Sequence, residues 1–341
     1  MDRVPPEPDF DCADLIRVSR RVDVADAVGL PAPCEVALDV VAPRSFEPGL
    51  PPLALCCLPG GYLTRRYYDL DAEGDSSYSF SAFMAERGFV TVALDHLGSG
   101  ESTKPAAADD LSLARVADAN HFAMQTVLTA LRSGTLSPEL PALDVLASVG
   151  VGHSMGSALG VVQQARSASH DALLLFSFST GGFEDFLLPG EREFANRPEE
   201  AIENLPRLAR ARFESPYPRV GGRTTKGREA AFATGTAEKA GVRALKKCGT
   251  NLVAQPGLLT MIPGGYAPFA ADIQVPVFVA TGDHDLTDPL DANLCFPKAR
   301  EFVAYQLDDS WHCHNVARTR QLLWERSANW IRSVVNEGTI A

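Results

Sequence analysis

The sequence lacks the long hydrophobic runs of a membrane protein. No apolar stretch approaches the roughly 18 consecutive residues that a membrane-spanning helix needs, so no transmembrane segment is expected. The first residues, MDRVPPEPDFD, are acidic and proline-rich and contain no apolar core, which predicts that they are not a signal peptide. The simplest expectation is a cytoplasmic protein.

Cysteine is present, but without a pattern that indicates metal binding or disulfide bonding. The seven cysteines are odd in number, irregularly spaced and contain no CxxC pair. This argues against both a zinc ribbon and a disulfide framework. Cys56 and Cys57 stand side by side in an apolar run and are interpreted as small core residues.

The chain has no excess of positive charge, because 43 acidic residues outnumber 31 lysines and arginines and give a net charge of −12. Proteins that bind nucleic acid or membrane surfaces in a general way usually rely on positive charge, so neither kind of partner is expected. The composition, with 45% hydrophobic and 22% charged residues, is that of an ordinary globular protein. We expect a small-molecule substrate as the partner and a monomer or homodimer as the assembly.

Short apolar runs of β type alternate with longer helical patterns along most of the chain. This alternation predicts an α/β fold with a mostly parallel, doubly wound sheet covered by helices. The expected strands are 15–24, 34–41, 53–58, 89–95, 145–152, 172–178, 275–281 and 301–307, and the expected helices are 77–87, 114–131, 155–167 and 316–335.

Residues 183–272 interrupt this alternation, because they contain no clear strand pattern. A structureless loop of that length is improbable in a compact domain, so we predict a helical lid inserted after the sixth strand. The core would then consist of residues 1–182 and 273–341. Within the lid, residues 207–228 contain seven basic side chains and one acidic one. This basic segment either attracts an anionic substrate or carrier protein, or is a solvated surface.

The strongest motif is Gly152-His153-Ser154-Met155-Gly156, a G-x-S-x-G sequence between an apolar strand and a helix. A nucleophile at this position lies on a sharp, strained turn that projects its hydroxyl above the sheet. Side chains two residues before and after would clash at such a turn, which explains the two glycines. We therefore predict that Ser154 is a nucleophile.

A serine nucleophile needs a base, and the base needs a carboxylate to orient it. In proteins with such a strand–turn–helix nucleophile, called a nucleophile elbow, the acid comes later in the chain, after one of the last strands. Asp285 follows strand 275–281 and is the favoured acid, with Asp283 and Asp288 as alternatives. The competing interpretation is that these carboxylates cap a helix around residues 289–295.

The base comes last in this chain order, and only His312 and His314 follow the acid. His312 stands nearer the end of the last strand and is favoured, while His314 is the alternative base. The His-Cys-His run also suggests a metal site. However, ligands at i and i+2 without a second cluster do not make a tetrahedral set, so no metal is expected.

An oxyanion hole completes the predicted site, because two backbone N–H groups must face the charge that develops on the attacked carbonyl. The residue after the nucleophile, Met155, is the first expected donor. The glycine-rich turn after the third strand supplies the second, for which Gly61 and Tyr62 are the candidates. Ser179 and Thr180, which follow the sixth strand, are possible substrate contacts because ligands of open α/β sheets lie at the carboxyl ends of strands.

Together these motifs resemble the α/β-hydrolase superfamily along almost the whole chain outside the lid. The segment Asp95-His-Leu-Gly-Ser-Gly-Glu-Ser102 is similar to the D-x-x-G-x-G-x-S turn of that family, which is usually structural. Pro59 stands where the family often has histidine before its oxyanion glycines. The resemblance also implies that haloalkane dehalogenase or epoxide hydrolase activity is not expected, because those enzymes have aspartate in place of Ser154.

The predicted reaction is two-step acyl transfer on a carboxylic ester, lactone or thioester, without organic cofactor or metal. Carbon–carbon bond hydrolysis of a diketone uses the same three residue types and remains an alternative. Biosynthetic acyl transfer or cyclisation is another, if a second hydroxyl replaces water. Outside enzymes, the alternative is a small-molecule receptor on the same fold.

Overall fold

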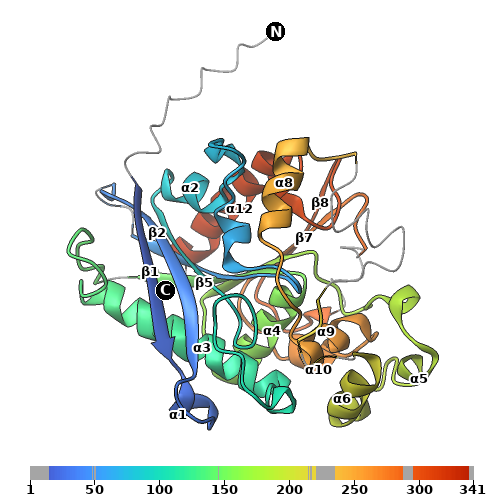
Figure 1. Ribbon diagram of the computed structural model, residues 1–341. Helices are drawn as coiled ribbons and strands as arrows, with labels where there is room; N and C mark the ends of the chain where they lie inside the picture. Colours follow the sequence, from blue (N-terminus) through green and yellow to red (C-terminus); the bar gives the residue numbers. More distant parts are fainter. Residues whose placement is uncertain are drawn as a thin grey trace.

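An eight-stranded sheet runs through the computed structural model of the protein, with helices on both of its faces (Figure 1). The strand order is β1-β2-β4-β3-β5-β6-β7-β8. Strand β2 is antiparallel to both β1 and β4, and every pair from β4 to β8 is parallel. The structure describes residues 15–47, 49, 51–144, 146–213, 215, 217–219, 235–286 and 295–337.

The strands agree closely with the apolar runs of the sequence, and the predicted α/β-hydrolase fold with a mostly parallel, doubly wound sheet is confirmed. Their bounds are β1 Leu15–Asp23, β2 Glu35–Pro43, β3 Leu53–Leu58, β4 Phe89–Leu94, β5 Ala147–His153, β6 Ala172–Phe176, β7 Val277–Gly282 and β8 Phe302–Leu307. The four strands β3 to β6 are buried along both faces, apart from Ala147, the first residue of β5. Continuous apolar runs are typical of parallel strands covered on both sides.

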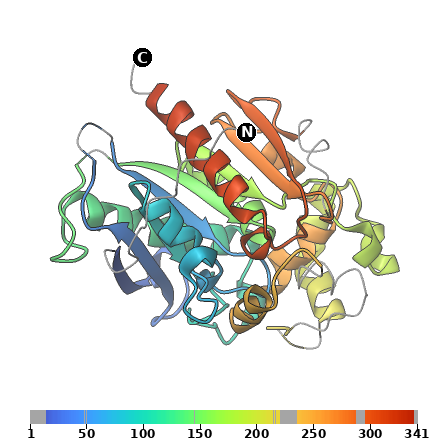
Figure 2. The same ribbon diagram turned by 90° about the horizontal axis from the view of Figure 1, so that it is seen from above.

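The helices form two layers. They are α1 Ala25–Val28, α2 Phe80–Ala85, α3 Leu113–Arg132, α4 Met155–Ser167, α5 Pro189–Arg192, α6 Pro198–Arg212, α8 Lys239–Lys247, α9 Ala254–Met261, α10 Ala267–Ala270 and α12 Arg320–Glu337. Buried side chains of α3, α4, α6 and α9 share one core with alternate strand residues, and those of α2, α8 and α12 share the other. Seen from above, α12 lies across its face of the sheet (Figure 2).

Two predicted helices are shorter than expected, for local reasons. The helix expected over 77–87 is divided, because Ser79 accepts a hydrogen bond from the Ala82 N–H and so begins α2 at Phe80. The last helix begins at Arg320 instead of residue 316. The preceding turn is anchored by Asn315, whose side-chain amide donates to the backbone oxygen of Tyr67 and whose side-chain oxygen accepts from the Trp324 indole.

The chain between β6 and β7 is helical in its described part, with α5, α6, α8, α9 and α10 and no strand among those residues. These helices do not form a separate layer, because α8 lies with α2 and α12 while α9 lies beside α4 (Figure 1). The segment after α8 also bonds to the loop after β3: Thr64 N–H donates to Cys248 O at 2.9 Å, and Thr250 N–H donates to Tyr62 O at 2.8 Å. Part of the insertion is therefore attached to the core.

The six cysteines within the described residues are all buried. None of the helices in the described part of the chain is long and apolar enough to cross a membrane.

Candidate active site

The turn between β5 and α4 holds Ser154 in an unusual backbone conformation, with φ 54° and ψ −119°. L-residues rarely adopt positive φ, and such strain is often found at functional sites. The turn closes tightly, because a Cβ at Gly156 would overlap the carbonyl oxygen of Leu58, and a Cβ at Gly152 would overlap the backbone of Ser157. Glycine at both positions is thus a condition of the turn that presents the Ser154 hydroxyl.

The structure brings Ser154, His312 and Asp285 into one hydrogen-bonded chain. The Ser154 Oγ lies 2.8 Å from Nε2 of His312, and Nδ1 of the same ring lies 2.7 Å from Oδ1 of Asp285. The three side chains come from the ends of β5, β7 and β8, which are neighbours or near neighbours at the carboxyl edge of the sheet. This arrangement lets His312 take a proton from the serine while the carboxylate fixes the ring.

Asp285 is buried and has several donors around it. Its Oδ1 also accepts from the Leu286 N–H at 2.6 Å, and its Oδ2 accepts from the Ser177 hydroxyl at 2.6 Å. Burial alone would raise the pKa of Asp285. The electrostatic attraction of His312 and the hydrogen bonds from His312 and His314 outweigh burial and hold that pKa well below its ordinary value. The carboxyl group is therefore ionised at neutral pH.

The two candidate histidines occupy different places. Only His312 reaches Ser154, whereas Nε2 of His314 lies 3.3 Å from Oδ2 of Asp285 and 3.1 Å from the Ser177 Oγ. Of the two alternative acids, the structure describes only Asp283. Asp283 accepts the backbone N–H groups of Asp309 and Ser310, so it stabilises the turn after β8. Asp288 lies outside the described residues.

Two of the predicted oxyanion donors, Gly61 and Met155, lie close to each other. A Cβ built on Gly61 would be 3.9 Å from the Met155 Cβ, and Met155 is the first residue of α4, where backbone N–H groups have no acceptor within the helix. Tyr62 has a positive φ of 67°. His96 contacts the start of the loop that contains Gly61 and Tyr62, because its Nε2 lies 2.9 Å from the Pro59 oxygen.

The turn that begins at Asp95 anchors the same loop. Arg65 donates its backbone N–H to Oδ1 of Asp95 at 2.7 Å and its guanidinium to Oδ2 at 2.6 Å. The same guanidinium also contacts Asp39 and Glu101. Arg65 and Asp95 are buried, and their ion pair ties the segment after Gly61 to the Asp95 turn, which agrees with a structural role for that turn.

The hydroxyls of Ser179 and Thr180 are both engaged within the protein. Ser179 accepts the Gly181 N–H at 2.9 Å, and the Thr180 Oγ1 lies 2.6 Å from the sulfur of Cys295. Their predicted role as substrate contacts stays a prediction.

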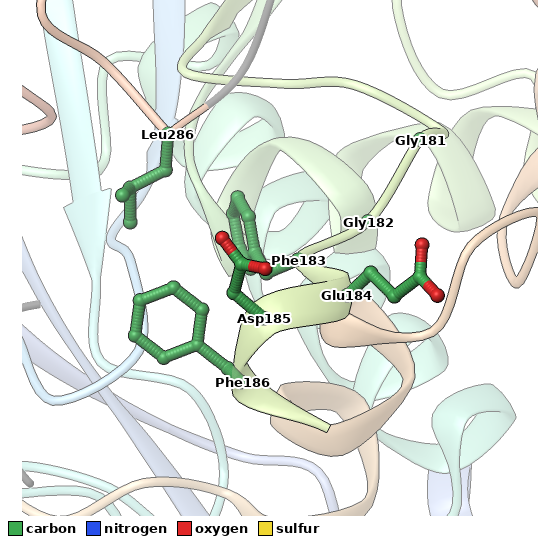
Figure 3. Close-up of a pocket in the computed structure, with 7 residues that line it drawn as sticks. All are labelled: Gly181, Gly182, Phe183, Glu184, Asp185, Phe186 and Leu286. Carbon is green, nitrogen blue, oxygen red and sulfur yellow. The ribbon is translucent and has the colours of Figure 1, made fainter. Parts of the chain in front are cut away.

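A surface pocket follows these residues along the chain, lined by Gly181, Gly182, Phe183, Glu184, Asp185, Phe186 and Leu286. In Figure 3 the side chains of Phe183, Phe186 and Leu286 face one another, while the carboxylate of Glu184 points away from them. The pocket borders the site, because the Phe183 ring lies edge-on to His312 with centroids 6.0 Å apart.

The basic segment 207–228 is partly neutralised by acids from elsewhere in the chain. Arg210 lies 3.4 Å from Asp109, and Arg212 forms an ion pair with Glu191 while donating to the Phe186 backbone oxygen at 3.0 Å. Arg223, Lys226 and Arg228 lie outside the described residues. Within the described part, these pairs favour a structural role over attraction of an anion.

Sequence reasoning missed Ser177, which links both histidines to Asp285. The available signal was its position at the carboxyl end of β6, where polar groups of neighbouring strands converge. Reasoning from the sequence also missed Phe183, because nothing in the sequence shows which residue of a long insertion returns to the site.

Comparison with protein families decides the family. The model of the alpha/beta hydrolase family matches residues 57–323, which is most of the chain. The protein belongs to the alpha/beta hydrolase family. No curated protein matches the sequence significantly.

Solved structures show the same fold at low sequence identity. A hypothetical protein from Pseudomonas aeruginosa aligns with a TM-score of 0.59 and 16% identity, covering 97% of this chain and 98% of that one. The N-acyl homoserine lactonase AidH aligns with a TM-score of 0.54 and 14% identity, covering 93% and 98%. A thioesterase domain from the curacin biosynthetic pathway aligns with a TM-score of 0.51 and 16% identity, covering 91% and 98%. At these identities the likeness concerns the fold alone.

Proposed function

We propose that this member of the alpha/beta hydrolase family is a serine hydrolase that works through an acyl-enzyme. The observation that carries the proposal is the hydrogen-bonded chain from Ser154 through His312 to Asp285, with distances of 2.8 and 2.7 Å. These are hydrogen-bond distances between a nucleophile, a base and an orienting acid, which is the geometry that serine activation requires.

In the first step His312 takes the proton of Ser154 as its oxygen attacks the substrate carbonyl. Because Nδ1 of His312 donates to the ionised Asp285, its Nε2 lone pair faces the serine, and the imidazolium that forms is paired with a carboxylate. The backbone N–H of Met155 and that of Gly61 or Tyr62 donate to the developing oxyanion.

In the second step the protonated His312 donates its proton to the leaving group, which departs and leaves an ester on Ser154. The same imidazole then accepts a proton from water, and the resulting hydroxide equivalent attacks the acyl carbon. Collapse of the second tetrahedral intermediate releases the carboxylic acid and restores the serine hydroxyl.

Carboxylic esters, lactones and thioesters are the substrate classes that this chemistry favours. Two structural neighbours are, by their names, a lactonase and a thioesterase domain, and both activities belong to this group. The pocket beside His312 is lined by two phenylalanines and one leucine together with the carboxylates of Glu184 and Asp185, so its mixed lining leaves the substituent of the substrate open. We also propose that residues 183–272, which supply Phe183, act as the lid of this site.

The proposal is tested with a fluorophosphonate probe, which phosphonylates an activated serine. We expect the wild-type protein to gain one probe mass and the Ser154→Ala variant to gain none. An absence of labelling in the wild type, or equal labelling of both proteins, would contradict a serine hydrolase and favour a receptor on the same fold. Hydrolysis of p-nitrophenyl butyrate by the same two proteins is the second readout, with turnover expected only in the wild type.

A further inference from the structure

Asp285 is held by two side chains that the proposed mechanism does not use. Its Oδ1 faces His312, whereas its Oδ2 faces the Ser177 hydroxyl at 2.6 Å and Nε2 of His314 at 3.3 Å. Ser177 and His314 also contact each other, with 3.1 Å between Oγ and Nε2. Both are buried, and the His314 side chain is 0% exposed.

The positions of the protons follow from these distances. The Ser177 hydroxyl lies near both Oδ2 of Asp285 and the His312 backbone oxygen, but its single proton goes to the shorter contact with the charged carboxylate. Its oxygen can then accept from His314, whose Nε2 lies 3.1 Å from that oxygen and 3.3 Å from Oδ2 of Asp285, so one N–H is shared between the two acceptors. Because Nδ1 of His314 is buried and makes no hydrogen bond within the described residues, the proton of that ring belongs on Nε2, where acceptors are present.

We propose that His314 is a positioning residue, which acts with Ser177 to fix the carboxylate of Asp285 in the orientation that serves His312. This inference rests on the proposed function. A carboxylate with only one oxygen fixed can rotate about χ2, and then Oδ1 no longer faces His312 squarely. Donors on Oδ2 prevent that rotation, and they draw part of the carboxylate charge away from His312.

Asp285 is the anionic group beside His314, because the other titratable groups around that ring carry no negative charge. The His153 ring lies on one side, with its centroid 6.4 Å away, and Phe176 lies on another at 6.0 Å. Tyr67 accepts the N–H of the adjacent Asn315, and burial raises the pKa of its hydroxyl well above the ordinary value, so it carries no charge. Cys313 is likewise uncharged, because burial raises its thiol pKa to about 12.

The loss of His314 therefore has two effects on the reaction. His312 is less well oriented, which lowers the rate at every pH. The carboxylate that faces the His312 imidazolium also loses one hydrogen bond, so its charge acts on that ring more strongly and acid inactivation begins at a higher pH. A role limited to packing would lower the rate or the stability but leave the pH dependence in place.

The experiment measures the second-order rate constant of fluorophosphonate labelling between pH 5 and 9 for the full chain. His314→Leu removes the donor, and His314→Gln keeps an N–H donor on a side chain of similar reach. Thr281→Val is the matched control, because its buried hydroxyl near the end of β7 makes no hydrogen bond within the described residues. Thermal unfolding reports whether each variant is folded.

We expect His314→Leu to label on the order of tenfold more slowly at pH 8, as for the loss of one hydrogen bond to a charged group. The pH of half-maximal labelling should rise, His314→Gln should recover most of the rate, and Thr281→Val should match the wild type. If His314→Leu keeps the wild-type rate and pH profile, or if His314→Gln is as slow as His314→Leu with no shift in that profile, the inference is wrong. Absence of labelling in the wild type would instead overturn the proposed function and this inference with it.

Discussion

The two sides of the candidate active site are built in different ways. The nucleophile side is local, because five consecutive residues, 152–156, hold Ser154 at a positive φ between β5 and α4. The acid–base side is assembled from three strand ends: Ser177 follows β6, Asp285 follows β7, and His312 follows β8. Its contacts join residues far apart in sequence, such as Ser177 and His314, which are 137 positions apart.

This difference determines whether a substitution on each side affects folding or chemistry. The local turn depends on close backbone packing, which a single methyl group disrupts. The assembled side depends on the register of parallel strands, and its side chains can be exchanged one at a time without moving the backbone. Substitutions on the first side should therefore affect folding, whereas those on the second should affect chemistry.

The largest effect is expected at Ser154, the proposed nucleophile on the local side. Ser154→Ala should lower hydrolysis of p-nitrophenyl butyrate by about 10⁴-fold or more, because the nucleophile is lost. Its midpoint of thermal unfolding should stay within a few degrees of the wild type, since the positive φ at this position is about as unfavourable for Ala as for Ser. Ser133→Ala, a serine at the exposed end of α3, is the control and should keep full activity. Normal turnover by the Ser154 variant would rule out this nucleophile.

On the assembled side, Asp285→Asn should lower the same activity by about 10³- to 10⁴-fold, because the amide favours the wrong tautomer of His312. Asp283 lies on the same turn, but it accepts the backbone N–H groups of Asp309 and Ser310 and lies 3.9 Å from the His284 ring nitrogen, so the Asp283→Asn variant should remain within a few-fold of wild-type activity. Steady-state kinetics of both variants make the comparison. The roles of the two aspartates would have to be exchanged if the Asp283 variant were the inactive one.

Gly156→Ala tests the claim that the local side fails by misfolding. The added methyl would overlap the Leu58 carbonyl oxygen, a backbone atom that cannot move aside, and should cost about 3 kcal/mol of unfolding free energy. Gly190→Ala is the matched control, because a Cβ there meets nothing within 4 Å. Urea denaturation measures both. Equal stability of the two variants would show that the turn has room to relax.

Much of this molecule could be predicted from its sequence, but not all of it. The apolar runs locate all eight strands within about two residues, because burial on both faces leaves a strong signal at β3 and β5. The elbow was also predictable, since its glycines and serine are contiguous. The sequence favoured His312 over His314 as the base but left both open, because both follow β8 and the register of the sheet decides which ring faces Ser154. Ser177 gave no signal, because a single serine after a strand has many possible roles.

The smallest expected effect lies at the opposite end of β5 and β6, away from the reacting groups. His170 is buried between Ser148 and Gln163, and burial lowers its pKa from 6.5 to about 3. The unfolded chain takes up this proton below pH 6.5 while the folded protein does not, so His170 contributes stability that is lost as the pH falls. Between pH 7 and 5 the loss should be about 2 kcal/mol.

This pH dependence can be isolated with His170→Gln. The difference in unfolding free energy between the wild type and this variant should shrink by about 2 kcal/mol from pH 7 to 5, as measured by urea denaturation at each pH. Labelling of Ser154 at pH 7 should stay unchanged, since His170 lies outside the active site. A difference that stays constant with pH would mean that His170 takes up its proton at the same pH in the folded and the unfolded protein.

The central claim is that His312, and not His314, is the base that activates Ser154. The most direct measurement is the fluorophosphonate labelling rate of His312→Gln beside that of His314→Gln, at pH 8 and with both proteins shown to be folded. We expect His312→Gln to label at least about 10³-fold more slowly than the wild type, and His314→Gln to stay within about tenfold of it. The reverse order, or rapid labelling of Ser154 in both variants, would contradict the account.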